Sequence, residues 1–582
     1  MDKKYRLEAN AEKESDLLLT HCRLVNVLSG EIEPDVDIAI CGREIVGVGS
    51  GYRAKRVIDV GGRYVYPGFI DAHIHLESTK LTIPEVARLM ARFGTSTVIT
   101  DPHEISNVAA LDGLSYQIDS ARHNGYINVF FVAPSCVPTL TDMSIESAPS
   151  VLDPDKLRMA MAQKEVVGLG EVMNVPGILM GDATVLEKIS DFRSRGLVID
   201  GHAPLVSGPA LNTCVYMGVQ SDHESTNIDE AREKLRRGMY IMIREGSSEK
   251  NLDALLPLVN ARNTGRMMFA SDDLDPTDLK SRGHINHLVK RAVAAGLDPI
   301  AAIQMATLSP AMYFGLQNRL GAIFAGAQAD IVIASDLSSF EPDIVLHEGR
   351  IVFENGAIQP AGTPHKVYLH STMNVVLPSL DALAVHAETG QKLRAIQLVP
   401  GQILTRQIEF DPTIVNGMVQ ADKSMDIAKV CVFERHHGSG AFGKAFVRGF
   451  GLQCGAIGSS VGHDSHNMVV VGMDDASILQ CARMIQKMGG GQAAVLGDES
   501  AVLPLPVAGL MSDRTADEVI RDEAALDAFC AQKLGVTLAR PMAALSFMSL
   551  PVIPELRITD QGLFYIAPGG YPVKVDNIVN WH

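Results

Sequence analysis

Residues 64–75 read YVYPGFIDAHIH, an apolar run that ends in His73 and His75. The apolar residues before the two histidines indicate a buried strand. Alternate residues of a strand face the same side, so both imidazoles point the same way from its end. A lone buried histidine is more often part of a packed core than a ligand, but two on one face of a strand end favour a metal site.

The same pattern repeats along the chain. From Val65 to Asp273, apolar runs alternate with amphipathic helical stretches. The eight strand candidates are YVYPGFIDAHIH, TSTVITDPHE, INVFFVAPS, VVGLGEVMN, LVIDGHAP, VQSDHES, YIMIREGS and MMFASDD. Repeated βα units are typical of an α/β protein with a (β/α)8 barrel, which we expect over residues 65–320.

Polar residues gather where these runs end, and barrel enzymes build their active sites at the C-terminal ends of the strands. Six of them are predicted metal ligands: His73, His75, Glu171, His202, His223 and Asp272. This set of nitrogen and oxygen donors is large enough for two divalent ions that share a carboxylate. Asp272 and Glu171 are also predicted to be the catalytic groups that move protons.

Two of these assignments have alternatives. Asp273 lies beside Asp272, and either could be the ligand while the other caps the following segment; the preference for Asp272 comes mainly from the family resemblance described below. His202, in DGHAP, could instead brace a turn. Further polar side chains at the strand ends are predicted to bind substrate: His103, Glu77, Ser135, Asn174 and Arg244. His103 could equally form a hydrogen bond with the carboxylate of a metal-binding residue, without contacting substrate itself.

The segments on either side of the barrel read as short strands. Residues 1–64 and 321–371 are expected to join as one small β-sandwich. Residues 372–582 mix strands, glycine clusters and helices, which predicts a separate C-terminal α+β domain. Its His436, His437, His463 and His466 are weak signals for a metal site of their own. We expect some of them to reach over the barrel mouth or into a subunit contact.

Composition narrows the class of protein. The 582 residues carry a net charge of -17, so a nucleic-acid duplex is not an expected partner, whereas a small ligand is compatible. The eight cysteines lack a CxxC pair, which suits free thiols in the cytoplasm. The charged N-terminus MDKKYRLEANAEKES lacks the apolar stretch of a secretory signal, and no apolar run is long enough to span a membrane.

The motifs PGFIDAHIHLES, DPHEI, PSCVP, GLGEVMN, IDGHAP, SDHES, IREGS and SDD occur in the order and form seen in adenine deaminases, a branch of the amidohydrolase superfamily. FERHHGSGAFGKAFVRGFGL and GHDSHN resemble the extra C-terminal domain of that family. The resemblance covers essentially the whole chain. It implies a metal-dependent hydrolase barrel that removes the 6-amino group of adenine. The bond cleaved is a C–N bond of a cyclic amidine.

The resemblance also bears on the site. It implies the same six ligands, with Glu171 where many relatives carry a carboxylated lysine, and two divalent ions of manganese, iron or zinc type, manganese preferred. It implies a homodimer or a larger homo-oligomer. Two loops depart from the family pattern: Lys80 follows Glu77-Ser78-Thr79, and Leu274-Asp275 follows Asp273. These departures leave open another 6-substituted purine, such as N6-methyladenine, as the substrate.

Two other functions stay open at this stage. A cyclic-amide hydrolase of the same superfamily would attack a dihydropyrimidine or a hydantoin, but Glu171 in place of lysine and the additional C-terminal domain argue against it. A purine-binding regulator on an inactive barrel would have lost a metal ligand, and none of the six is missing.

Overall fold

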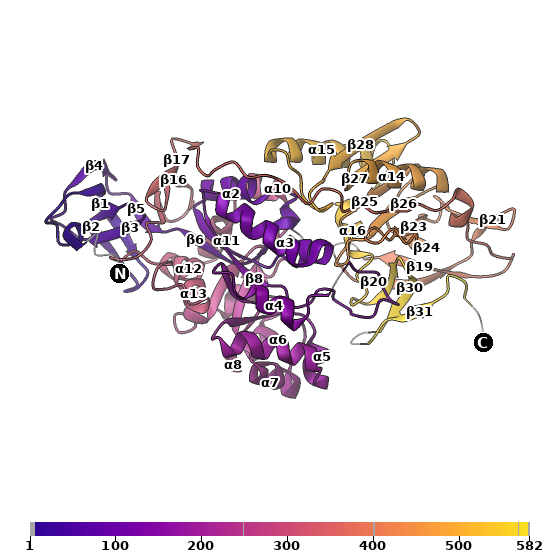
Figure 1. Cartoon of the computed structure of the whole chain (residues 1–582), viewed down its shortest axis with the longest axis horizontal. Coiled ribbons are helices and arrows are strands. Elements are labelled where there is room, and N and C mark those ends of the chain that lie inside the picture. Colours follow the sequence, from indigo (N-terminus) through magenta and orange to yellow (C-terminus); the bar gives the residue numbers. More distant parts are fainter. Residues whose placement is uncertain (1–5, 150, 248, 400–401, 568–569, 580–582) are drawn as a thin grey trace.

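The computed structural model describes the chain except residues 1–5, 150, 248, 400–401, 568–569 and 580–582. An N-terminal sheet lies at one end of the molecule, a helix-covered barrel in the middle, and a β-rich C-terminal domain at the other end (Figure 1). Among the described helices, none combines the length and the apolar character needed to cross a bilayer.

The central body is the predicted barrel, whose strands pair in parallel throughout. Its strands are β6 (Phe69–His75), β7 (Thr95–Thr100), β8 (Asn128–Ala133), β9 (Val166–Val172), β10 (Val198–Gly201), β11 (Ser221–Asp222), β12 (Tyr240–Arg244), β13 (Met267–Ala270) and β14 (Asp272–Asp273). β14 continues β13 and pairs with β6, which closes the ring on that side. On the other side, the Gln220 N–H donates to the Ile199 carbonyl, and the Tyr240 N–H donates to the Gln220 carbonyl.

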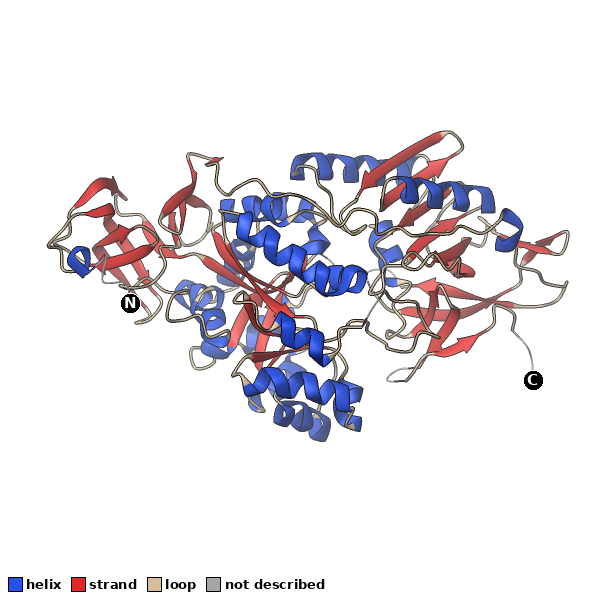
Figure 2. Ribbon diagram, viewed as in Figure 1, coloured by secondary structure: helices blue, strands red, loops and turns tan. Residues whose placement is uncertain are grey.

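Helices surround these strands (Figure 2). Strand β7, TSTVIT, is buried at all six positions, as expected for a parallel strand with side chains packed on both faces. The helices of this layer are α2 (Ile83–Arg92), α3 (His103–His123), α4 (Pro154–Ala160), α5 (Val175–Met180), α6 (Ala183–Ser194), α7 (Gly208–Met217), α8 (Ile228–Arg236), α9 (Leu252–Leu255), α10 (Pro276–Arg282), α11 (Ile285–Ala294), α12 (Pro299–Ala306) and α13 (Leu308–Tyr313).

The two segments that flank the barrel meet as predicted, in one nine-stranded sheet. Val65 of β5 lies opposite Ile333 of β15 in an antiparallel pair. The sheet encloses an apolar core that includes Leu19, Ile38 and Leu346. Its strands are β1 (Ser15–Asn26), β2 (Glu31–Cys41), β3 (Glu44–Val48), β4 (Ala54–Asp59), β5 (Tyr64–Pro67), β15 (Ile331–Ala334), β16 (Pro342–His347), β17 (Arg350–Glu354) and β18 (Ala357–Ile358).

The C-terminal domain is built on an eight-stranded sheet in the order β20-β19-β24-β23-β26-β25-β27-β28. These strands are β19 (Leu393–Leu398), β20 (Thr405–Phe410), β23 (Ile427–Phe433), β24 (Phe442–Arg448), β25 (Ala456–Ser459), β26 (Met468–Gly472), β27 (Gly491–Leu496) and β28 (Glu499–Pro504). Its helices are α14 (Asp475–Lys487), α15 (Ala516–Gln532) and α16 (Pro541–Phe547), and a small sheet follows from β29 (Glu555–Thr559), β30 (Gly562–Ile566) and β31 (Val573–Val575). Mixed strands and helices fit the predicted α+β class.

A partly buried ion-pair cluster joins this domain to two barrel loops. Lys80 Nζ lies 2.8 Å from Asp275 Oδ2 and 2.5 Å from Glu523 Oε1, and Glu523 belongs to α15. The Ser512 N–H donates to the Lys80 carbonyl at 2.8 Å. Lys80 and Asp275 are two of the residues at which the sequence departs from the family pattern, and the structure pairs them with each other.

Replacing Lys80 by methionine is expected to lower the free energy of unfolding by about 2 kcal/mol, between the values typical of exposed and of fully buried ion pairs. The change leaves Asp275 and Glu523 close together without their shared cation. Urea unfolding measures the difference. The matched control is Lys55→Met, which breaks a 2.7 Å pair with Asp16 whose side chains are 66% and 49% exposed. Equal losses in the two variants would contradict the structural role of the Lys80 cluster.

Candidate metal centre

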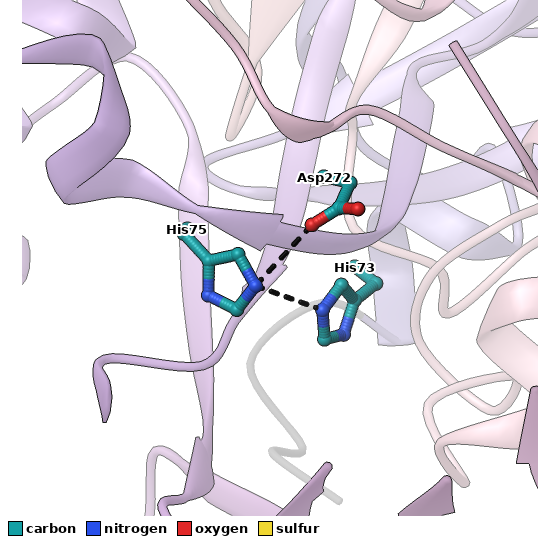
Figure 3. A group of neighbouring side chains, drawn as sticks. All are labelled: His73, His75 and Asp272. Carbon is teal, nitrogen blue, oxygen red and sulfur yellow. Dashed lines mark hydrogen bonds and ion pairs between the residues drawn. The ribbon is translucent and has the colours of Figure 1, made fainter. Parts of the chain in front are cut away.

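His73 and His75 come together at the end of β6, beside Asp272 of β14 (Figure 3). The Nε2 atoms of the two histidines are 3.3 Å apart, and His75 Nε2 is 3.3 Å from Asp272 Oδ1. All three side chains are buried. The predicted pair on one strand face therefore converges with the predicted carboxylate of the eighth strand.

The far side of each ring fixes which nitrogen faces the cluster. His75 Nδ1 lies 2.9 Å from the carbonyl oxygen of Asp101, which can only accept, so Nδ1 carries the proton. His73 Nδ1 lies 3.1 Å from the carboxylate of Asp200 and donates to it. In neutral rings, the two Nε2 lone pairs then point at each other across 3.3 Å. A cation between them removes this repulsion, so the donor set fits a metal ion.

Glu171, at the end of β9, links this group to two more histidines. Its Oε1 is 3.4 Å from His75 Nε2, whereas its Oε2 is 3.2 Å from His223 Nε2 and 2.7 Å from His202 Nδ1. His73 and His223 stack with ring centroids 4.2 Å apart. All six residues predicted as ligands therefore meet in one place, and His202 joins the cluster instead of bracing a turn.

Both acidic members are held as carboxylates. Burial works to raise the pKa of Glu171, but the nearby His202 and His223 bring that pKa well below its ordinary value. Burial acts on Asp272 in the same way, and the charge of Arg244 with the contact to His75 lowers its pKa well below the usual range. Ionised oxygens are the form that a divalent ion requires.

Asp272 and Asp273 have separate roles. Asp272 faces the histidines, in the left-handed region at φ 57°, where a non-glycine residue is strained. Asp273 accepts a hydrogen bond from Ser78 Oγ. The cap of the following helix α10 is Asp275, whose Oδ1 accepts from the Thr277 N–H at 2.9 Å. The preference for Asp272 agrees with this geometry, but the expectation that Asp273 caps the next segment is wrong.

Arg244 is held by carboxylates at the edge of the cluster. Its Nη1 and Nη2 donate to Glu224 Oε1 and Oε2 at 2.6 and 2.9 Å, and Nη1 also contacts Asp272 Oδ2. Glu224 Oε1 lies 3.5 Å from both His202 and His223. Glu224 was not among the predicted residues, although it follows His223 directly in the motif SDHES.

Two predicted substrate contacts have local structural roles. Ser135 Oγ donates to the backbone carbonyl of Glu171 at 2.6 Å, which supports the ligand from behind. Asn174 caps α5, and its Oδ1 accepts from the Gly177 N–H at 2.8 Å. The residues that line the cavity beside the metal centre do not include Ser135, Asn174 or Arg244. Their contact with a substrate stays a prediction.

The cavity lies where the C-terminal domain meets the barrel mouth. The barrel contributes Glu77, Ser78, Glu104, Asp273 and Leu274, and the C-terminal domain contributes Val461, His463, His466, Leu510, Met542 and Phe547. The expectation that some C-terminal histidines reach over the barrel mouth is therefore confirmed for His463 and His466. His437, by contrast, is 53% exposed and pairs with Glu434 of its own domain.

Glu77 and His103 border this region from the barrel side. Burial raises the pKa of Glu77 to about 7, and the charge of Glu104 adds to the effect. Glu77 lies on a short 3-10 turn, residues Leu76–Thr79, rather than on the strand, yet its side chain lines the cavity. His103 Nδ1 is 3.4 Å from Glu171 Oε1, which suits the alternative that it supports a ligand carboxylate from behind.

The fold and the cluster together define a metal-dependent hydrolase barrel. Residues 64–352 match the model of the amidohydrolase family, in which divalent metal use is the rule, and residues 402–568 match that of the adenine deaminase C-terminal domain. Among solved structures, a β-aspartyl dipeptidase from Fervidobacterium islandicum AW-1 aligns with 60% of this chain and 99% of its own, at 17% identity and a TM-score of 0.46.

Curated relatives carry the assignment further. An adenine deaminase of Dehalococcoides mccartyi is 43% identical over 95% of this chain and 96% of its own. Adenine deaminases of Desulfatibacillum aliphaticivorans and Methanothrix thermoacetophila are each 43% identical, over 95% and 97% of this chain and 96% and 97% of their own. The chain belongs to the adenine deaminase family, and the resemblance drawn from its motifs is confirmed.

Proposed function

We propose that this protein hydrolyses adenine to hypoxanthine and ammonia. The observation that carries the proposal is the six-ligand cluster at the barrel mouth, next to a cavity between the barrel and the C-terminal domain whose wall includes Glu104 and Asp273, close neighbours of the cluster. The names of relatives 42–43% identical over nearly the whole chain support it. A non-catalytic regulator would have lost ligands, whereas all six lie together here.

Two divalent ions per chain are part of this proposal, with manganese preferred and iron or zinc as alternatives. The two oxygens of Glu171 face different histidines, which suits a carboxylate shared by two ions. His73, His75 and Asp272 form one donor group, and His202 and His223 contribute to the other. Divalent ions in such a site lower the pKa of water towards neutrality, which supplies a nucleophile at neutral pH.

The residues of the chain then have to move protons. Addition of water at C6 places negative charge on the purine ring, so N1 must gain a proton and the amine must be protonated before it leaves as ammonia. Asp272 is the proposed carrier, because its carboxylate lies within 3.3 Å of His75 at the centre of the cluster. Glu171 could share this work. Arg244 orients Asp272 from the opposite side.

The cavity wall suits a flat base. Val461, Leu510 and Phe547 provide apolar surface, while Glu77 and Asp273 provide carboxyl groups whose oxygens suit ring N–H donors. Lys80 and Leu274, where the sequence departs from the family pattern, also line the cavity. An additional methyl group on a substrate changes binding by only about 1–3 kcal/mol, so N6-methyladenine is the alternative substrate.

The cellular setting belongs to the same proposal. We propose a cytoplasmic homodimer or larger homo-oligomer that acts in purine salvage and adenine catabolism. All eight cysteines are free, which suits a reducing compartment. Helices α5 and α7 pack together and expose Met180 and Tyr216 at 80% and 79%, which suits a subunit contact.

A substrate panel on protein reconstituted with manganese tests the proposed reaction. We expect adenine to give the highest kcat/KM, N6-methyladenine to be turned over more slowly, and adenosine to be rejected, because a pocket closed over N9 clashes with ribose. Ultraviolet change and ammonia release measure turnover. Faster turnover of adenosine or guanine would mean that the substrate is wrong, and turnover of a hydantoin or dihydropyrimidine instead would favour the cyclic-amide alternative.

A further inference from the structure

We propose that His463 of the C-terminal domain is a substrate-contacting residue that donates a hydrogen bond from Nε2 to a purine ring nitrogen other than N1. The inference rests on the proposed function and deepens it, because it assigns part of the base-binding site to the domain outside the barrel. His463 lines the cavity beside the metal centre.

The orientation of the His463 ring is fixed from three sides. Its Nδ1 lies 2.8 Å from Glu104 Oε1, so the Nδ1–H donates a hydrogen bond to the carboxylate. Phe547 stacks on one face, with ring centroids 4.6 Å apart and an interplanar angle of 19°. The backbone N–H of His463 donates to the Ser546 carbonyl at 2.8 Å. A ring held in this way presents one fixed edge to a ligand.

The nitrogen left for a ligand is Nε2. No hydrogen bond joins it to a residue within the described part of the chain, whereas Nδ1 is taken by Glu104. His466 differs, because its Nδ1 accepts from the Gly462 N–H and its Nε2 contacts Glu104 Oε2. The His466 side chain is completely buried against Glu104 and is a positioning residue for it, whereas the His463 side chain is 10% exposed and is the one able to contact substrate.

The charges around the ring make Nε2 a donor. Burial alone would lower the pKa of His463, but the charge of Glu104 and its hydrogen bond raise that pKa to about 9. Asp273 and Asp464 add further negative charge. A protonated ring offers an N–H that matches the lone pair of N3 or N7, since N1 is the position that gains a proton in the reaction.

A chain of contacts also connects His463 to the metal centre. Glu104 Oε1 is 3.2 Å from His103 Nε2, and His103 Nδ1 is 3.4 Å from Glu171 Oε1. Glu104 therefore positions a barrel histidine and a C-terminal histidine with one carboxylate. Only the side chains of Glu104 and His103 lie between His463 and Glu171. A base that binds His463 therefore has a defined position relative to Glu171.

The test compares adenine with 3-deazaadenine and 7-deazaadenine, each of which lacks one ring-nitrogen acceptor. In His463→Ala, kcat/KM for adenine should fall roughly ten- to hundredfold, the usual worth of a hydrogen bond from a charged donor. With the wild-type protein, kcat/KM for one of the two analogues should be lower than that for adenine by a similar factor. With the variant, kcat/KM for that analogue should be close to that for adenine, because the same contact is already absent. Manganese content should be unchanged.

The control is His437→Ala, an exposed imidazole of the same domain that does not line the cavity. His463→Leu keeps most of the side-chain volume without an N–H donor, and the same ratios are read from it if the alanine variant does not fold. Unchanged turnover of adenine in folded His463 variants, or analogue losses equal to those of the wild type, would overturn the contact alone. A wild-type protein inactive on adenine would overturn the proposed function and the contact with it.

Discussion

Replacing His75 by alanine is expected to remove metal and activity together. His75 Nε2 lies within 3.4 Å of His73, Glu171 and Asp272, so its loss opens the centre of the cluster. Metal catalysis supplies several kcal/mol of transition-state stabilisation, which corresponds to a fall in kcat/KM on the order of a thousandfold or more. Manganese per chain, measured by atomic emission after reconstitution, should fall below the two equivalents proposed for the wild type.

A suitable control is His347→Ala in the N-terminal sheet. His347 is also buried, and its Nδ1 lies 3.0 Å from the Asp330 carboxylate, much as His73 contacts Asp200. This change tests the loss of a buried imidazole without touching the cluster, and manganese content and kcat/KM should be retained. A fully active His75→Ala protein would remove the basis of the metal assignment.

The barrel and the ligand set could be predicted because both depend on local patterns. Each parallel strand is an apolar run that ends in an ionisable residue, and the ends of all such strands meet at one face of the barrel. Strand parity alone places His73 and His75 together, and the structure confirms their contact at 3.3 Å. The order of strands around the ring brings Glu171, His202 and His223 to the same place.

Supporting residues were harder to recognise, although some left a signal. Asn174 precedes Val-Pro-Gly, and an asparagine followed by proline at the first helical turn is typical of a helix cap, the role that it has here. Asp101 and Asp200 also end apolar runs: the Asp200 carboxylate orients His73, and the Asp101 carboxylate accepts from the backbone N–H of Glu171, while its backbone carbonyl orients His75. Because a strand-end carboxylate can serve as a ligand or as a second-layer partner, spacing does not separate the two roles.

The wall that the C-terminal domain adds could not be derived from local patterns. Glu104 and His463 are 359 residues apart in the chain, yet their side chains meet at 2.8 Å. Lys80 and Glu523 are likewise joined only by the docking of α15 on the barrel loops. Such contacts depend on how two domains pack, and neither the strand period nor a short motif carries that information.

Asp272→Asn is expected to separate chemistry from metal binding. The amide keeps the size of the side chain and an oxygen for a divalent ion, but it cannot accept and return a proton. We expect kcat to fall by about a hundred- to ten-thousandfold, the range for a lost general acid–base group, while two manganese ions still bind at saturating concentration. KM should change little, because the contact acts in the transition state.

The geometry explains why the substitution should act on Asp272 as a proton carrier and not on the fold. Its Oδ1 is 3.3 Å from His75 Nε2, a position that the single asparagine oxygen can keep, and Arg244, which loses its contact with Oδ2, is still held by both oxygens of Glu224. Asp330→Asn, a buried acid of the N-terminal sheet that pairs with His347, is the matched control and should retain kcat. If Asp272→Asn kept kcat within tenfold of the wild type at full metal occupancy, proton transfer would have to be reassigned to Glu171, the other carboxylate at the centre of the cluster.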